Sequence, residues 1–245
     1  MIGLILLWIV GITAFSLLGA WYARRYARAD ALMGLYVTFV LISNIIAYKI
    51  VEFDLGFTLV YASAAIMIFS VTFLFTDIVN ERFGRKETHK MILIAFITQV
   101  AVTFFIWIAI QLPPAPFWNG QETFAQVFGF VPRIILASWV SFLISENLDA
   151  YIFSWFKRVT KGKHLWMRNA FSSLPTMALD SVIFVTLAFY GVQQGLGAII
   201  LGTAVMKWFV GIVDIPFMYL NRYVMYHGVK NTNTIFKSKD GLSTH

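Results

Sequence analysis

Two residues of opposite charge lie inside apolar stretches of the sequence, where charged side chains are rare. Asp180 belongs to the stretch 174–190 and Lys207 to the stretch 196–220. At a rise of about 1.5 Å per residue, both lie well inside helices long enough to cross a bilayer, at nearly the same depth. We therefore expect them to form an ion pair. Such a pair either holds two helices together or binds a substrate or a proton.

A single asparagine lies in another apolar stretch. Asn44 lies toward the end of residues 31–51, where the chain is otherwise strongly apolar. An asparagine inside a membrane helix bonds to a neighbouring helix or contacts a substrate, and the sequence favours neither.

The stretch 132–156 carries a polar face. Spacings of three, four and four residues place four polar residues on one side of a helix, with Glu146 close by: Ser138, Ser141, Ser145 and Asp149. Small hydroxyl residues at this spacing are typical of close helix packing. A polar pocket lined by this face is the alternative.

Residues 113–130 form a connection rich in proline and aromatic residues. So many aromatic side chains favour a cap folded at the membrane interface, or a gate over an outward-facing pocket. Polar and aromatic residues at a similar predicted depth are therefore candidate substrate contacts, namely Asn44, Lys49, Gln111, Trp118 and Arg133. Arg133 is equally suited to anchor its helix at the interface. Deeper candidates are Glu146, Asp180 and Lys207.

The composition requires a lipid environment for these elements. Of the 245 residues, 59% are hydrophobic and 13% are charged, and the mean hydropathy is +0.75. A soluble domain has about 25% charged residues. We predict an all-α, multi-pass membrane protein with seven spans, over residues 2–21, 31–51, 57–75, 91–112, 132–156, 174–190 and 196–220.

The distribution of basic residues predicts the orientation. Sixteen of the 19 Lys and Arg residues fall in alternate connections and in the C-terminal segment. We expect the protein in the cell (inner or plasma) membrane. The positive-inside rule then places the N-terminus outside and the C-terminus in the cytoplasm. The high pI reflects this topology, so no nucleic-acid partner is expected. We divide the chain into an extra N-terminal helix with its basic loop (1–30), a six-helix functional core (31–225) and a cytoplasmic tail (226–245).

The motifs of enzymes and metal sites are absent from the sequence. There is no cysteine, the four histidines are scattered, and no HExxH, P-loop, GxGxxG or GxSxG pattern occurs. We therefore predict a protein that is not an enzyme and that needs neither a cofactor nor a metal.

Several segments together resemble a known family. They are SNIIAYK (43–49), TDIVNERFG (76–84), LPPAPFW (112–118), VPRIILAS (131–138) and KHLWMRN through LDSVIF (163–184). The second contains Asp77, Glu81 and Gly84 in a charged cytoplasmic hairpin, in which Gly84 supplies the turn. The combination is similar to the queuosine-precursor transporters, also known as integral-membrane vitamin-uptake transporters.

The resemblance implies a six-helix core like the substrate-binding components of energy-coupling-factor transporters, and import of a 7-deazaguanine such as preQ0 or preQ1. A planar, nucleobase-like ring can stack on aromatic side chains, and its edge needs both donors and acceptors. The alternative is a binding subunit that depends on ATPase partners. The first helix lacks a small-residue docking repeat, which favours autonomous transport. The sequence leaves open whether the protein forms a homo-oligomer.

Overall fold

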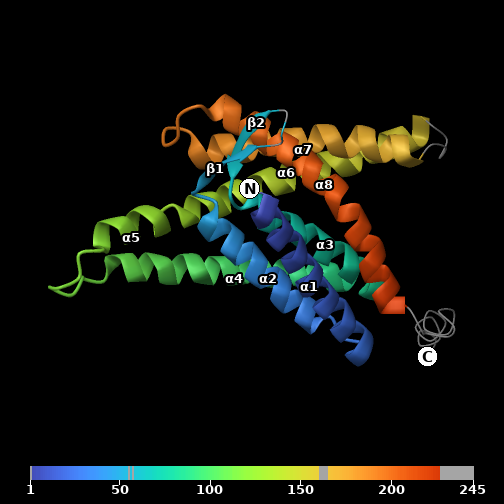
Figure 1. Cartoon of the computed structure of the whole chain (residues 1–245), viewed down its shortest axis with the longest axis horizontal. Coiled ribbons are helices and arrows are strands. Elements are labelled where there is room, and N and C mark those ends of the chain that lie inside the picture. Colours follow the sequence, from blue (N-terminus) through green and yellow to red (C-terminus); the bar gives the residue numbers. More distant parts are fainter. Residues whose placement is uncertain (1, 55, 57, 160–164, 227–245) are drawn as a thin grey trace, which may run out of the picture.

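A computed structural model describes residues 2–54, 56, 58–159 and 165–226, with the side chains of some helical residues left out of the description. It is predominantly helical (Figure 1). The elements in chain order are α1 (Ile2–Tyr26), α2 (Asp30–Ile46), β1 (Ile50–Asp54), β2 (Leu59–Ser63), α3 (Ile66–Phe83), α4 (Arg85–Gln111), α5 (Gln121–Phe128), α6 (Val131–Val159), α7 (Leu165–Phe189) and α8 (Leu196–Tyr226).

Four helical stretches are long and apolar enough to cross a membrane. They are Leu6–Tyr26, Arg85–Gln111, Gln121–Ser145 and Leu196–Val213, and two shorter apolar helical stretches cover Asp30–Ile46 and Leu174–Phe189. This agrees with the predicted class, an all-α membrane protein. A helix overlaps each of the seven predicted spans, but seven membrane crossings stay a prediction.

A β-hairpin corrects two of the predicted spans. The helix expected over 31–51 ends at Ile46, and the first part of the stretch 57–75 is strand β2 rather than helix. The strands pair antiparallel, with Glu52 opposite Tyr61, and burial along β2 alternates between successive residues. Hydropathy cannot separate a short apolar strand from a helix end, which is why the sequence analysis missed the hairpin.

The hairpin packs closely on α8. A Cβ atom added at Gly202 of α8 would collide with the backbone of Tyr61 in β2. Phe53, Val60 and Met206 are buried together at this contact. Glycine at position 202 therefore allows the strand to lie directly on the helix, close to the turn that carries Lys207.

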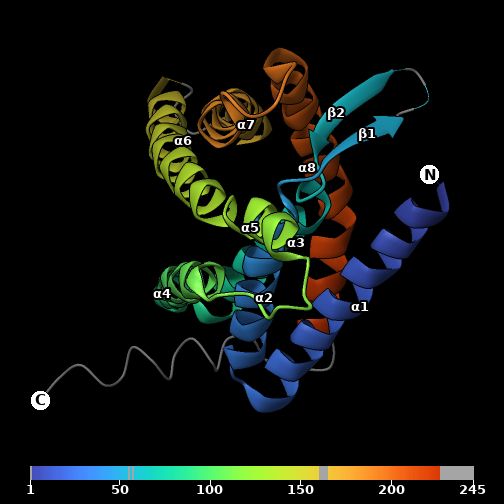
Figure 2. The same cartoon turned by 90° about the vertical axis from the view of Figure 1, so that its left-hand side faces the viewer.

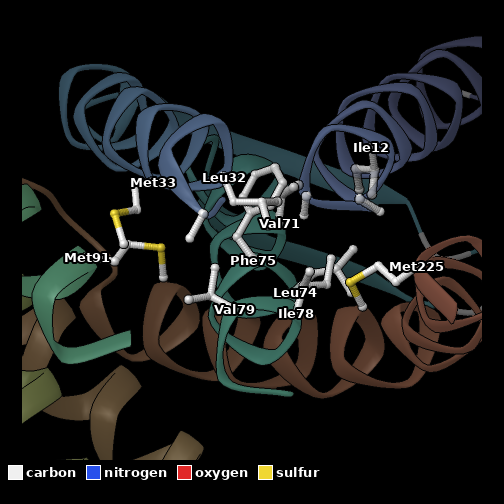
Figure 3. Close-up of a cluster of buried hydrophobic side chains, with 13 residues drawn as sticks. Ile12, Leu32, Met33, Val71, Leu74, Phe75, Ile78, Val79, Met91 and Met225 are labelled. Atoms are coloured by element: carbon white, nitrogen blue, oxygen red, sulfur yellow. The ribbon is translucent and has the colours of Figure 1, made fainter. Parts of the chain in front are cut away.

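The main apolar cluster joins α1, α2, α3 and α8 (Figure 3). Leu74 and Phe75 of α3 lie at its centre, between Leu32 of α2 and Met225 of α8. Ile12 brings α1 into the same cluster. A hydrogen bond from Asn221 Nδ2 of α8 to Ser16 Oγ of α1, 3.1 Å long, ties these two helices as well. The N-terminal helix, predicted as an addition to a six-helix core, is thus packed against that core.

The remaining helices pack in neighbouring pairs. Helices α6 and α7 lie side by side (Figure 2), and α8 packs against α7. Helices α3 and α4 are joined through Gly84, whose positive φ of 82° suits a residue without a side chain. This confirms the predicted turn. The side chains of Asp77 and Glu81, the other residues of that hairpin, are not among those described.

Candidate functional site

A buried network of neutral polar groups links α2, α4 and α6. Asn44 Nδ2 donates to Gln99 Oε1 at 2.7 Å, and Trp139 Nε1 donates to the same oxygen at 3.3 Å. Ser138 Oγ donates to Asn44 Oδ1 at 3.4 Å. Asn44 and Gln99 are each 4% exposed. We call Asn44, Gln99, Ser138 and Trp139 the amide cluster.

The helices fix the geometry of the amide cluster. Gln99 Nε2 bonds to the Ala95 carbonyl of its own helix at 3.3 Å, which orients its Oε1 toward Asn44 and Trp139. The ring of Phe96 meets the Trp139 ring edge-to-face, with centroids 3.9 Å apart. The cluster therefore combines amide donors and acceptors with aromatic surface, the combination that a planar heterocycle needs.

Sequence reasoning found only part of this cluster. Asn44 and Ser138 were singled out, but Gln99 and Trp139 were not. The available signal was Gln99 itself, an amide in the middle of the apolar stretch 91–112. A polar residue at such a position needs a partner inside the bundle.

The predicted ion pair between Asp180 and Lys207 is present. The Lys207 ammonium donates to Asp180 Oδ2 across the contact between α7 and α8. The side chain of Asp180 is 17% exposed and that of Lys207 is 12% exposed. Trp208 Nε1 donates to the Leu174 carbonyl at 3.2 Å and adds a second polar contact between the two helices. The charges are therefore compensated by each other inside the bundle.

The serine face of α6 points largely into the protein. Ser141 and Ser145 are buried, and Ser138 bonds to Asn44. Ser141 Oγ donates to the Ser138 carbonyl of its own helix at 3.1 Å, whereas the buried Ser145 hydroxyl has no partner. This face thus serves both close packing and the amide cluster. The side chain of Glu146, the next residue, lies outside the description.

The connection between α4 and α5 projects at one end of the molecule (Figure 1). Trp118 is 44% exposed, and its ring lies edge-on to Phe124 at 6.1 Å between centroids. Gln111, at the end of α4, is exposed. It is twelve residues, or about 18 Å along the helix, from Gln99. No described contact joins Trp118 or Gln111 to the amide cluster.

Arg133 holds the end of α7. Its Nε donates to the Leu187 carbonyl at 2.8 Å and its Nη2 to the Tyr190 carbonyl at 2.6 Å. The guanidinium lies over the Phe130 ring, 5.6 Å from the centroid. A cation at a helix C-terminus satisfies the free carbonyls and the helix dipole. The geometry therefore supports the anchoring role that the sequence analysis set beside substrate contact.

Near Arg133, the end of α2 meets α5. The Tyr48 ring packs on Phe130 at 5.0 Å, and Gln126 Nε2 donates to the Tyr48 hydroxyl at 3.5 Å. Lys49 follows as an exposed residue.

Among the described residues, no group of three or more His, Asp and Glu side chains is placed to hold a metal ion.

The sequence matches one transporter family over most of the fold. Residues 63–221 match the family described as "Putative vitamin uptake transporter". The chain belongs to this family. The matched region begins at the end of β2 and ends within α8, so it contains Gln99, Ser138, Asp180 and Lys207. It leaves out Asn44 and the whole of α1.

Curated relatives of this transporter family carry a more specific name. A protein of Bacillus subtilis (strain 168), named "Probable queuosine precursor transporter", is 30% identical over 193 residues, which cover 76% of this chain and 82% of the relative. The "Queuosine precursor transporter" of Escherichia coli (strain K12) is 25% identical over 122 residues, 50% of this chain and 52% of the relative. No solved structure matches the chain. The family resemblance seen in the sequence motifs is confirmed, and the chain is a multi-pass membrane protein of a transporter family.

Proposed function

We propose that this protein imports a queuosine or archaeosine precursor, a 7-deazaguanine such as preQ0 or preQ1, across the cytoplasmic membrane. The family and the names of the relatives support transport of such a precursor. The amide cluster is the observation that supports a nucleobase-like substrate. It is a buried set of neutral donors and acceptors between three helices of a membrane transporter.

The chemistry of a deazaguanine edge complements this cluster. The ring N–H and the exocyclic amine are donors and need acceptors such as Asn44 Oδ1 and Gln99 Oε1. The ring carbonyl needs a donor, which Asn44 Nδ2 or the Trp139 indole N–H supplies. A ligand that enters would exchange the hydrogen bonds within the cluster for bonds to itself. The Trp139 and Phe96 rings then offer faces or edges for contact with the planar ring.

The other candidate residues have a role before and after this site in the proposed scheme. We propose that Lys49, Gln111, Trp118 and Arg133 meet the substrate first, at the outer ends of their elements. Glu146, Asp180 and Lys207 act deeper. There the Glu146 carboxylate accepts from the donor pair of the ring, and the Lys207 ammonium, once released from Asp180, donates to its carbonyl. The aromatic connection 113–130 acts as a gate in this scheme.

The proposed orientation places the N-terminus outside and the turn at Gly84 in the cytoplasm. A single cysteine at position 86 tests it directly, because the chain has no cysteine of its own. In intact cells, Lys86→Cys should react with a membrane-impermeant maleimide only after the membrane is opened. Labelling from outside would reverse the orientation.

Transport by the purified chain tests the function. Lipid vesicles that contain this protein alone should exchange labelled preQ0 or preQ1 across the membrane, and unlabelled deazaguanines should compete more strongly than adenine. Thr98→Val is a matched control for a change at Gln99, because Thr98 is the preceding residue and its hydroxyl bonds within its own helix. Absence of exchange would contradict autonomous transport. Binding without exchange, with transport restored by ATPase partners, would instead identify a binding subunit.

A further inference from the structure

A threonine precedes each member of the ion pair by one helical turn. Thr176 stands four residues before Asp180 on α7, and Thr203 stands four residues before Lys207 on α8, so each threonine shares a face with its charged neighbour. Both threonines are buried. Thr203 is 3% exposed and its hydroxyl has no hydrogen-bond partner. Because an unsatisfied buried hydroxyl is costly, a partner that arrives and leaves is the natural complement to Thr203.

The ion pair is electrically isolated among the described residues. The ion pairs Arg28–Asp30 and Lys90–Glu87, by contrast, are both well exposed. The pair inside the bundle has no second counter-ion in this part of the structure. Removing either charge therefore leaves the other without compensation, so neutralising one residue requires a new partner for the other.

Two described arginines of the neighbouring elements bond elsewhere. On α6, Arg133 bonds to the end of α7, and on α1, Arg24 Nη1 donates to the Val224 carbonyl. In the hairpin, a hydrogen bond to Glu52 raises the pKa of Tyr61. The side chains of Glu146 and Asp149 on α6, of Asp77 and Glu81 on α3, and of Asp214 on α8, two turns after Lys207, are not part of the description.

We propose that Asp180 carries the proton that drives uptake, and that its protonation frees Lys207 to bind the carbonyl oxygen of the substrate. This inference rests on the proposed function. In the substrate-free state, the Lys207 ammonium is held by the Asp180 carboxylate. Lys207 can leave only when Asp180 is neutral, because an unpaired carboxylate inside the bundle is too costly.

The cycle balances in protons and charge. A proton from the outer medium binds an Asp180 carboxylate oxygen and breaks the ion pair. The Lys207 ammonium and the Thr203 hydroxyl then donate to the substrate carbonyl oxygen. On the cytoplasmic side the substrate leaves, the proton leaves Asp180, and the ion pair forms again. One proton enters with each substrate, and an uncharged substrate such as preQ0 therefore moves with one positive charge.

Gradient-driven accumulation in vesicles that contain only the purified protein tests this inference. With the membrane voltage held at zero, an exterior about one pH unit more acidic than the interior should support about tenfold accumulation of labelled preQ0. A protonophore should abolish it. Accumulation that is indifferent to the pH gradient would overturn the inference.

Two variants separate coupling from transport. Asp180→Asn imitates the protonated acid, so it should lose accumulation, and the exchange of labelled preQ0 that it retains should be independent of pH. Glu87→Gln, which removes an exposed ion pair, should accumulate like the wild type. Accumulation by Asp180→Asn at the wild-type level would contradict the proposal.

A measurement on the wild type covers the case in which Asp180→Asn does not fold. Addition of preQ0 to weakly buffered vesicles should make the outer medium more alkaline as proton and substrate enter together. Uptake without this pH change refutes coupling and leaves the proposed function intact. Failure of the wild type to exchange preQ0 at all refutes the proposed function, and the coupling scheme with it.

Discussion

The amide cluster and the ion pair both join helices inside the bundle, but they do so with opposite chemistry. In the cluster, the neutral groups of Asn44, Gln99, Ser138 and Trp139 satisfy one another through hydrogen bonds. Neutral donors and acceptors can change partners at small net cost, because each bond lost to a ligand is replaced. Such a cluster is suited to reading the edge of a substrate.

The ion pair behaves in an all-or-none way. Asp180 and Lys207 are tolerated in the bundle because they are together, and separation without a proton leaves two uncompensated charges. The difference teaches that the neutral groups on α2, α4 and α6 can exchange partners one at a time, whereas the charges on α7 and α8 can separate only with a proton. In the proposed scheme the first set reads the edge of the substrate and the second couples its uptake to a proton. The predictions below break each side of this comparison and then test the outer connection.

The largest effect is expected from loss of one charge. Lys207→Ala should lower the free energy of unfolding by ~3–5 kcal/mol, because Asp180 is left buried and unpaired. Thermal unfolding of the purified protein in detergent measures this loss as a lower Tm.

The double variant gives the control. Asp180→Ala combined with Lys207→Ala should regain most of the stability, since no charge is stranded. It should not regain accumulation of substrate. Restored accumulation in the double variant would reduce the ion pair to a structural contact between α7 and α8.

A smaller effect is expected in the amide cluster. Gln99→Leu removes the acceptor shared by Asn44 and Trp139 and should cost ~1–3 kcal/mol of stability. It should also weaken the binding of preQ0, which calorimetric titration measures. Thr98→Val, one residue away, should change neither value by a comparable amount. Unchanged affinity in Gln99→Leu would remove the cluster from the substrate site.

The smallest effect on folding is expected at the outer connection. Trp118 is partly exposed and touches Phe124 and Gly120, so Trp118→Ala should leave thermal stability nearly unchanged. If its ring stacks on the entering substrate, affinity should fall about tenfold, at the low end of the ~1–3 kcal/mol measured for stacking on bases. Equal affinities of wild type and variant would confine recognition to the interior.

Parts of the fold and of the site follow directly from local sequence. The turn at Gly84 was predictable because a glycine stands between two helical stretches of opposite direction. The Asp180–Lys207 pair was predictable because both residues are costly alone in an apolar helix and lie at similar depth. The β-hairpin was not predictable, because the stretch 57–75 is as apolar as a helix and its strand partner lies outside it.

By itself, the sequence determined that this chain lies in a membrane, that its family is one of transporters, and that two intramembrane charges need each other. These properties follow from composition, motifs and the cost of isolated charge, which are local. Only the tertiary structure decided that Gln99 meets both Asn44 and Trp139, that Arg133 caps α7, and that Gly202 admits strand β2 against α8. Those contacts depend on the rotation of each helix about its axis. Rotation is set by the packing of all neighbouring side chains together, so no single stretch of sequence specifies it.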